Sequence, residues 1–221
     1  MLKKSFFACA FSLIAAFSAS AQDVTVTSAS TAGGGIKPTT GEITGEVQLS
    51  LTDGSTVGLN QLRGRYFLSP STALRLSFAL DAYNDTNDDE TRSTTLVSLS
   101  PGIEKHFAGT DRLSPYIGAE LRLSKFFASY EDDNFEVEGG WGTGTNRNYF
   151  GLGLGAVAGA DYYFAKHVYL GVEFGYGLTY RTYGEVEINP KNGASFTVDD
   201  DQNSLTLGSS VNGGLRLGFV F

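Results

Sequence analysis

The chain contains little cysteine, methionine, tryptophan or proline: one Cys, one Met, one Trp and 5 Pro occur among 221 residues. A single cysteine cannot form an internal disulfide, so ordinary packing or backbone hydrogen bonds must hold the fold. Only 18% of the residues are charged, and the net charge of -8 argues against nucleic-acid binding. Glycine is abundant (28 residues), as are phenylalanine and tyrosine (16 and 11), and this composition argues against an all-α domain.

Residues 1–21 have the three parts of a secretory signal peptide. Lys3 and Lys4 are followed by the apolar stretch 6–17 and by the small-x-small pattern of Ala19 and Ala21. The apolar stretch is too short for a transmembrane helix, and no longer one follows it. Cys9 lies before most of this stretch, a position that argues against lipidation. We therefore expect export and removal of residues 1–21, which leaves a more acidic chain without cysteine.

Residues 22–42 are rich in Thr, Ser and Gly and predict a flexible lead-in. From residue 43 onward, apolar residues recur with a period of two, the signature of strands with one apolar face. We expect eight strands, at residues 43–52, 57–68, 72–83, 94–107, 113–127, 149–164, 168–183 and from after residue 203 to the end. Apart from a tight turn at 53–56, long or polar loops (84–93, 128–148, 184–203) alternate with short turns (69–71, 108–112, 165–167). An even number of strands with unequal loops at the two ends is typical of outer-membrane barrels.

Glycine indicates which strand face points inward. On three of the strands the polar face is rich in glycine, at Gly151, Gly153, Gly155, Gly159, Gly171, Gly175, Gly177, Gly214 and Gly218. A solvated exterior would gain nothing from these glycines, whereas the narrow lumen of an eight-stranded barrel needs small residues beside large ones. We therefore predict that the polar face lines the lumen and that the apolar face meets lipid.

The predicted lumen face carries balanced charges. The acids are Glu46, Asp81, Glu104, Glu120 and Glu173, and the bases are Arg63, Arg65, Arg75, Arg122 and Arg216. Because buried charges are tolerated only when they are paired, these residues predict a salt-bridge network that plugs the lumen. Glu120 and Arg122, on the same face of one strand, are the leading pair. Some of the other charges could instead lie solvated near the rims.

The chain resembles the OmpA-type family of small outer-membrane β-barrels. The resemblance rests on the glycine-rich hairpin from Gly151 to Gly177, on the segment Pro115 to Glu120, and on the C-terminal strand from Leu215 to Phe221. It implies an all-β, eight-stranded antiparallel up-and-down transmembrane barrel over residues 43–221, in a Gram-negative outer membrane with its long loops extracellular. It also implies that Phe219 and Phe221 signal to the barrel assembly machinery. The chain departs from full-length members in lacking a periplasmic peptidoglycan-binding domain.

We expect no enzyme activity and no cofactor. His106 and His167 both lie at the short-turn end, on the wrong side for the lipid A chemistry of some similar barrels. The long loops carry acidic clusters, among them Asp199, Asp200 and Asp201, which are weak metal candidates because their spacing fits no known calcium cage. Acidic loops would repel lipopolysaccharide unless divalent cations bridge the two, so we expect cation-dependent ordering of the loops.

Three functions remain open at this stage. The first is a monomeric outer-membrane barrel with a plugged lumen and a structural or surface-interaction role, in integrity or adhesion, in contact with lipid and lipopolysaccharide. The second is a narrow porin for small solutes. The third is a soluble ligand-binding barrel with an apolar interior, since an alternating pattern alone does not say which face is inside.

Overall fold

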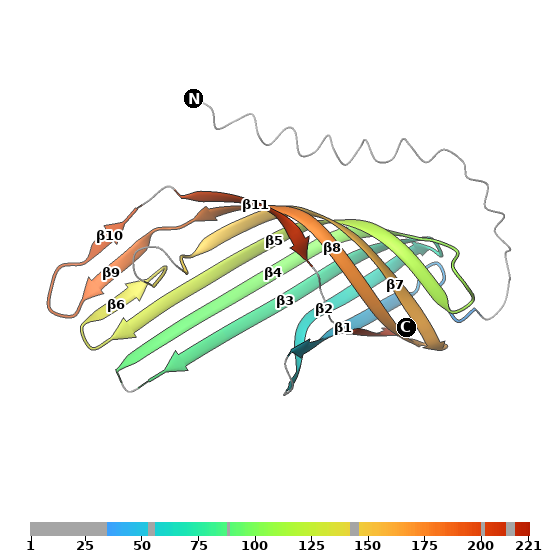
Figure 1. Ribbon diagram of the computed structural model, residues 1–221, viewed down its shortest axis with the longest axis horizontal. Coiled ribbons are helices and arrows are strands. Elements are labelled where there is room, and N and C mark those ends of the chain that lie inside the picture. Colours follow the sequence, from blue (N-terminus) through green and yellow to red (C-terminus); the bar gives the residue numbers. More distant parts are fainter. Residues whose placement is uncertain (1–34, 53–55, 88, 142–145, 200–201, 211–214) are drawn as a thin grey trace, which may run out of the picture. The chain divides into compact units, whose positions relative to one another are not determined.

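The computed structural model describes residues 35–52, 56–87, 89–141, 146–199, 202–210 and 215–221, and these residues form a single antiparallel sheet (Figure 1). Its strands are β1 (Ile43–Thr52), β2 (Thr56–Ser69), β3 (Thr72–Thr86), β4 (Glu90–His106), β5 (Leu113–Asp132), β6 (Phe135–Glu138), β7 (Tyr149–Ala165), β8 (Val168–Tyr183), β9 (Val186–Pro190), β10 (Phe196–Val198), β11 (Asn203–Ser210) and β12 (Leu215–Val220). Within this part of the chain, no helix is long and apolar enough to cross a membrane.

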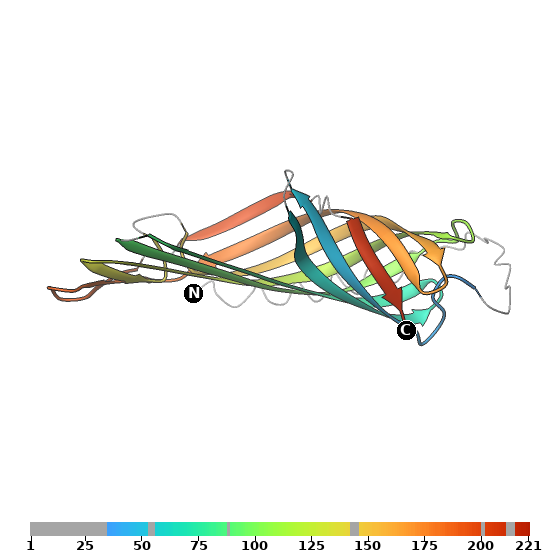
Figure 2. The same cartoon turned by 90° about the horizontal axis from the view of Figure 1, so that it is seen from below.

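The sheet closes on itself as a ring of eight strands. Neighbours pair in the order β1-β2-β3-β4-β5-β7-β8-β12, and β12 returns to β1. In Figure 2, β12 (red) lies beside β1 (blue) where the ring closes. β11 pairs with the half of β8 nearer the long loops, and β12 with the other half, so these two strands together occupy the eighth position. The predicted eight-stranded antiparallel barrel is confirmed.

The long-loop end differs from the sequence prediction. Strands β3, β4 and β5 continue beyond the predicted ends, and β6, β9 and β10 form inside the segments expected to be loops. β6 pairs with β5, β9 with β6, and β10 with β9 (Figure 1). These strands are only three to five residues long, so their period of two was too short to recognise.

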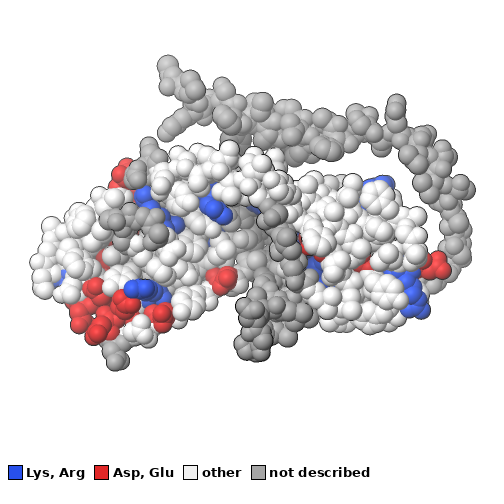
Figure 3. All heavy atoms as spheres, in the orientation of Figure 1, with Lys and Arg blue, Asp and Glu red and all other residues white. Residues whose placement is uncertain are grey.

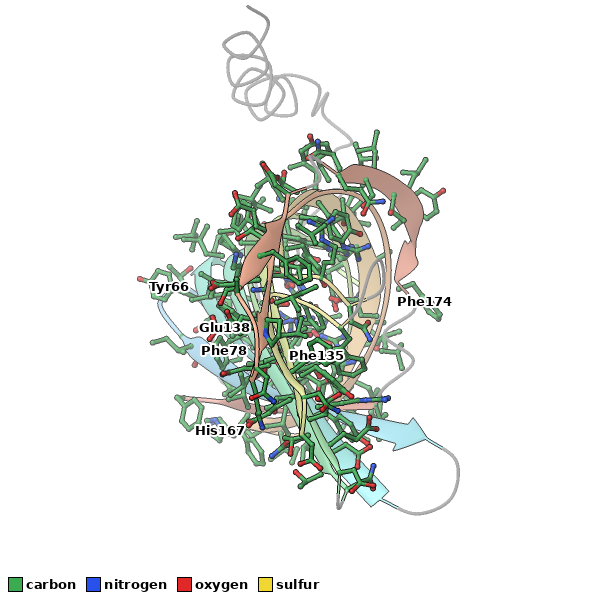
Figure 4. The ribbon with its side chains drawn as sticks, turned by 90° about the vertical axis from the view of Figure 1, so that its left-hand side faces the viewer. Tyr66, Phe78, Phe135, Glu138, His167 and Phe174 are labelled. Atoms are coloured by element: carbon green, nitrogen blue, oxygen red, sulfur yellow. The ribbon has the colours of Figure 1, made fainter. Side chains whose placement is uncertain are left out.

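The apolar face of the ring points outward, as predicted. Phe174 is 61% exposed, and Leu80, Leu76, Tyr66 and Ile117 are also exposed. Figure 4 shows Tyr66 and Phe174 pointing away from the barrel on different sides. Ten aromatic residues nearer the two ends of the ring are exposed too, namely Tyr66, Phe107, Tyr162, Phe164, Phe219, Phe221, Phe127, Phe150, Tyr176 and Tyr180. A band of this kind suits contact with lipid and rules out an apolar interior.

The glycine-lined face is inside. A Cβ atom added at Gly155 would lie 2.7 to 2.8 Å from the guanidinium of Arg122, and one at Gly218 would strike the ring of Tyr169. Large and small side chains therefore alternate in the lumen because there is no room for two large ones. Gly214 lies outside the described residues.

The short-turn end is filled by aromatic rings. Tyr163 and Tyr169 are fully buried, with ring centroids 4.9 Å apart, and Ile36 packs against them together with Val220. Lys37 Nζ donates to the carbonyl oxygen of Ala108, 2.7 Å away. Residues 35–42 of the expected flexible lead-in thus contact the barrel, whereas residues 22–34 and the expected signal peptide 1–21 lie outside the described residues.

The steric role of the lumen glycines predicts opposite outcomes for two substitutions. Gly218→Ala forces the buried Tyr169 ring to move and is expected to destabilise the barrel by about 1–3 kcal/mol. Gly208→Ala, in β11, meets nothing within 4 Å and is expected to leave stability unchanged or slightly raised. Urea unfolding of the refolded barrel, followed by the heat-modifiable gel shift, measures both. Equal stability of the two variants would contradict the account of the lumen.

Candidate functional site: the ion-pair network of the lumen

The centre of the lumen is built around two arginines that face each other on neighbouring strands. Arg65 of β2 and Arg75 of β3 are directly opposite in register, an arrangement that is repulsive by itself. Glu104 of β4 lies between them. Its two oxygens are each 2.8 Å from one guanidinium, Oε2 from Arg65 Nε and Oε1 from Arg75 Nη1. One carboxylate thus holds two like charges in place.

Arg65 also anchors the part of the network nearer the short turns. Its Nη1 lies 2.7 Å from Asp161 of β7 and 2.8 Å from Glu46 of β1. Arg216 of β12 contacts the same two acids, at 2.8 Å from Glu46 and 3.2 Å from Asp161. These contacts tie together β1, β2, β7 and β12, on both sides of the seam where the ring closes.

Glu173 of β8 is the hub of the next layer. Its carboxylate lies 2.8 Å from Arg63 and 2.9 Å from Arg75, and it accepts a 2.7 Å hydrogen bond from the hydroxyl of Tyr116. The Tyr116 ring also faces the guanidinium of Arg65, 4.8 Å from its centroid. These three polar contacts come from three different strands, β2, β3 and β5, none of which pairs with β8 among the described residues.

The top of the network, toward the long loops, is the pair of Glu120 and Arg122. Arg122 Nε lies 2.7 Å from Glu120, whose other oxygen lies 3.1 Å from Arg75. The Arg122 side chain is 22% exposed, against 2% or less for Arg63, Arg65, Arg75 and Arg216. The predicted pair therefore forms, and it is the layer of the plug most accessible from the long-loop end.

Nine of the ten residues predicted for the network lie in it: Glu46, Arg63, Arg65, Arg75, Glu104, Glu120, Arg122, Glu173 and Arg216. Asp81 does not. It lies on the inward face of β3, but it is exposed and nearer the long loops, where its cross-strand neighbour is Leu96 and no base of the described residues pairs with it. The prediction for Asp81 used the correct face and the wrong level along the strand.

Asp161 takes the place of Asp81 in the charge balance. It is fully buried and bound to Arg65 and Arg216, so five carboxylates still face five guanidiniums. Its position on the glycine-rich face of β7 was the signal that could have found it. Isolated buried ions are strongly unfavourable, so near-complete pairing is the condition on which this lumen can fold.

His106 lies in the plug as well. Its Nε2 is 3.1 Å from Glu104 and its Nδ1 is 3.0 Å from the hydroxyl of Ser114, while the rings of Phe67 and Tyr116 lie on either side, each 5.2 Å away. A neutral imidazole that donates to Glu104 and accepts from Ser114 satisfies all three groups. The order Ser, His, Glu matches that of hydrolase triads, but all three residues are less than 6% exposed. Substrate therefore has no access to the hydroxyl.

The long-loop end carries acidic side chains (Figure 3). A hollow of about 540 Å³ there is lined by Asn87, Asp89, Glu90, Tyr130, Asp132, Asp133 and Asn134. The hydroxyl of Tyr130 lies between Glu90 and Asp132, and these acceptors raise the pKa of Tyr130 to about 12, hydrogen bonding to Asp132 contributing most. No cluster of three or more metal-binding side chains occurs among the described residues. Of the weak metal candidates, Asp199 is exposed, while Asp200 and Asp201 lie outside the described residues.

Comparisons with known proteins identify one family and several similar structures. Residues 82–221 match the sequence profile described as "Putative OmpA-OmpF-like porin family". Similar solved structures include the N-terminal barrel domain of Pseudomonas aeruginosa OprF (17% identity, 83% of this chain and 100% of that one, TM-score 0.45). They also include P. aeruginosa OprG (12%, 84% and 98%, 0.45) and Ail of Yersinia pestis (14%, 82% and 99%, 0.43). No curated protein sequence matches the chain.

The hub position of Glu173 predicts a large effect of its neutralisation. Glu173→Gln leaves the buried Arg63 and Arg75 short of one negative charge, and we expect a loss of about 3–5 kcal/mol in unfolding free energy. Glu131→Gln, which removes the exposed ion pair with Lys191, is the control and should change stability by less than about 1 kcal/mol. Guanidinium unfolding in detergent micelles compares the two. A loss for Glu173→Gln no larger than for the control would contradict the role of the hub.

Asp132 predicts a pH effect confined to the tip between β5 and β6. Its carboxylate accepts the amide hydrogens of Asn134 and Phe135, at 2.7 and 2.6 Å, and the bond from Asn134 contributes most to holding the pKa of Asp132 below its usual range. A lowered pKa stabilises the tip above the ordinary Asp value of about 3.9, and the effect is lost as the pH falls through the lowered value. Hydrogen-exchange protection of these two amides should therefore fall in acid. In Asp132→Asn this acid step should be missing; its persistence would assign the step to another group.

Proposed function

Because the chain belongs to the OmpA-OmpF-like porin family of outer-membrane β-barrels, we propose that it is a closed barrel with a structural or surface-interaction role, in integrity or adhesion. The observation that carries this proposal is the filled lumen: five buried or nearly buried guanidiniums are paired with five carboxylates across the ring. In this proposal the long loops are extracellular, as is usual for small barrels of this kind.

Ion flow through such a lumen is opposed by the pairing itself. A passing ion or solute would have to separate charges that are held at 2.7 to 3.2 Å and have almost no access to water. The glycines leave no lateral space into which these side chains could retreat, because the guanidinium of Arg122 already lies against Gly155 and Gly177. A barrel closed in this way anchors its loops at the surface and transports nothing.

The second candidate is a narrow porin for small solutes. It is supported by the porin description of the family and by the partial exposure of Arg122, the uppermost cation. Glu120 contacts both Arg122 and Arg75. If Glu120 released Arg122 and kept only Arg75, the top layer of the plug would loosen while the lower layers stayed paired. The two candidates differ in one measurable property, the conductance of the unmodified barrel.

No catalytic role is part of the proposal, because Ser114, whose hydroxyl lies 3.0 Å from His106, is only 5% exposed. The proposed surroundings are outer-membrane lipid and lipopolysaccharide, with the barrel as a monomer and divalent cations bridging its acidic loops. Assembly through the C-terminal strand is supported by the outward position of Phe219 and by the hydrogen bond from the amide of Phe221 to Ile43, which joins the last strand to the first.

Planar-bilayer recordings of the refolded barrel test the plug. The parent should show no steady conductance, whereas Glu120→Ala and Arg122→Ala should open small steady channels, because each removes one member of the uppermost pair. Arg92→Ala is the matched control, since the Arg92–Glu90 pair lies at the long-loop end of β4 and outside the network.

Steady conductance of the parent would reject the closed barrel and favour the porin. Silent recordings from both lumen variants, with correct folding shown by the gel shift, would mean that the uppermost pair does not gate the lumen.

A further inference from the structure

Strands β6, β9 and β10, which lie outside the eight-stranded ring, form a small sheet with two different faces. Residues directly opposite each other in an antiparallel sheet project to the same side. Val137 is opposite Ile188, which is opposite Phe196, and these residues define what we call the apolar face. Glu138 is opposite Glu187, which is opposite Thr197, and these define the acidic face.

The apolar face is open at its outer edge. Val137 and Val186 are buried, but Phe135, Phe196 and Val198 are 42%, 52% and 37% exposed. Elsewhere in the barrel, exposed apolar side chains are explained by lipid around the ring. These three residues are on strands outside the ring, at the long-loop end that Figure 4 views directly, with Phe135 and Glu138 labelled on β6. Grouped apolar exposure without lipid marks an interaction surface.

The acidic face places like charges opposite each other on neighbouring strands. Glu131 of β5 is directly opposite Glu136, and Glu138 is directly opposite Glu187. Like charges in such positions destabilise a sheet. Among the described residues, the ion pair on this face is the one between Lys191 and Glu131, at 3.4 Å. The remaining negative charge favours a partner that brings basic groups.

The free edge of β10 adjoins both faces. β10 ends the order of strands in the sheet and pairs only with β9 among the described strands. An exposed edge presents main-chain donors and acceptors on which another extended chain can form a further strand. Alternate side chains of an added strand would meet the two faces in turn.

We propose that the β10 edge binds an extended segment of a partner polypeptide in which apolar and basic side chains alternate. The apolar side chains extend the row of Phe196 and Val198, and a basic side chain beside Thr197 points to the acidic face, where Glu187 on the next strand is the nearest acid. A second copy of this chain is the poorer occupant, because it would place one acidic face beside another. The inference deepens the surface-interaction role proposed above and rests on it, but it does not depend on the lumen being closed.

The test uses the full barrel refolded in nanodiscs of neutral phospholipid, with empty nanodiscs to measure peptide binding to lipid. The probe is a labelled peptide of about nine residues, a typical strand length, with alternating valine and lysine. Two peptides serve as comparisons: one with the same composition in two blocks, and one in which glutamate replaces lysine. Binding is followed by fluorescence anisotropy and by hydrogen exchange of the β10 amides.

We expect the alternating lysine peptide to bind and to protect the β10 amides, and the two comparison peptides to bind weakly or not at all. Phe196→Ser and Glu187→Gln should each weaken binding by roughly tenfold, because each removes contacts on one face. Tyr83→Ser and Asp89→Asn are the matched controls and should bind as the parent does. They change an exposed aromatic residue and an exposed acid of the long-loop end that are not on β6, β9 or β10.

Equal binding of the block peptide, or equal losses in the control variants, would reduce the effect to general charge attraction and overturn the proposal. Protection of β10 that depends on barrel concentration, without peptide, would assign the edge to a second copy and overturn it too. Conductance distinguishes the two hypotheses. A conducting barrel that binds the peptide rejects only the closed lumen, whereas a silent barrel that ignores the peptide rejects only this site.

Discussion

Arg65 and Arg75 lie directly opposite each other on neighbouring strands in the lumen, both almost completely buried, and Glu104 forms an ion pair with each of them. The need to pair these charges constrains the other residues of the lumen. Each guanidinium that enters the lumen needs a carboxylate, and a carboxylate shared by two guanidiniums leaves a positive charge that a further carboxylate must balance. The resulting network joins strands from all sides of the ring. Closure of the ring and neutralisation of the charges in its lumen therefore depend on each other.

The sequence determines much of this arrangement through two simple patterns. Alternation placed most ends of the first seven ring strands to within three residues. The exceptions are at the long-loop end, where β4 begins earlier and β5 ends later than predicted. Glycine on the polar face identified which face lines the lumen, because a crowded lumen needs small residues beside large ones. The motifs that resemble the OmpA-type family agree with the strand positions and with the choice of the inward face. These signals are local and periodic, and a single sequence carries them well.

Other features depend on level along the strand and on partners distant in sequence. Asp81 and Asp161 both lie on inward faces, yet only Asp161 is at the level of the guanidiniums, and alternation alone does not report that level. Strands β6, β9 and β10 were missed because their stability comes from pairing with β5 and with one another. The contact of Ile36 with Tyr163 and Tyr169 was missed for the same reason, since a Ser-rich and Gly-rich segment gives no sign of a single anchored residue.

The two ends of the barrel consequently have different characters. The short-turn end is finished with buried aromatic rings and an ordered stretch of the preceding segment, whereas the long-loop end extends the sheet into solvent with acids on one side and apolar residues on the other. A filled lumen between such ends is consistent with the structural or surface-interaction role proposed above. A transport path would have to pass ion pairs held at 2.7 to 3.2 Å.

Water access to the middle of the lumen tests the central claim most directly. Ser77 is 1% exposed, faces the lumen, and accepts a hydrogen bond from Arg63, while the only cysteine of the chain is Cys9, in the expected leader. Ser77→Cys therefore gives the barrel a single thiol at the level of the plug. In the folded barrel this thiol should resist a charged, water-soluble thiol reagent added to both sides, and should react fully after unfolding. Rapid labelling in the folded barrel would show an aqueous path through the lumen and contradict the account.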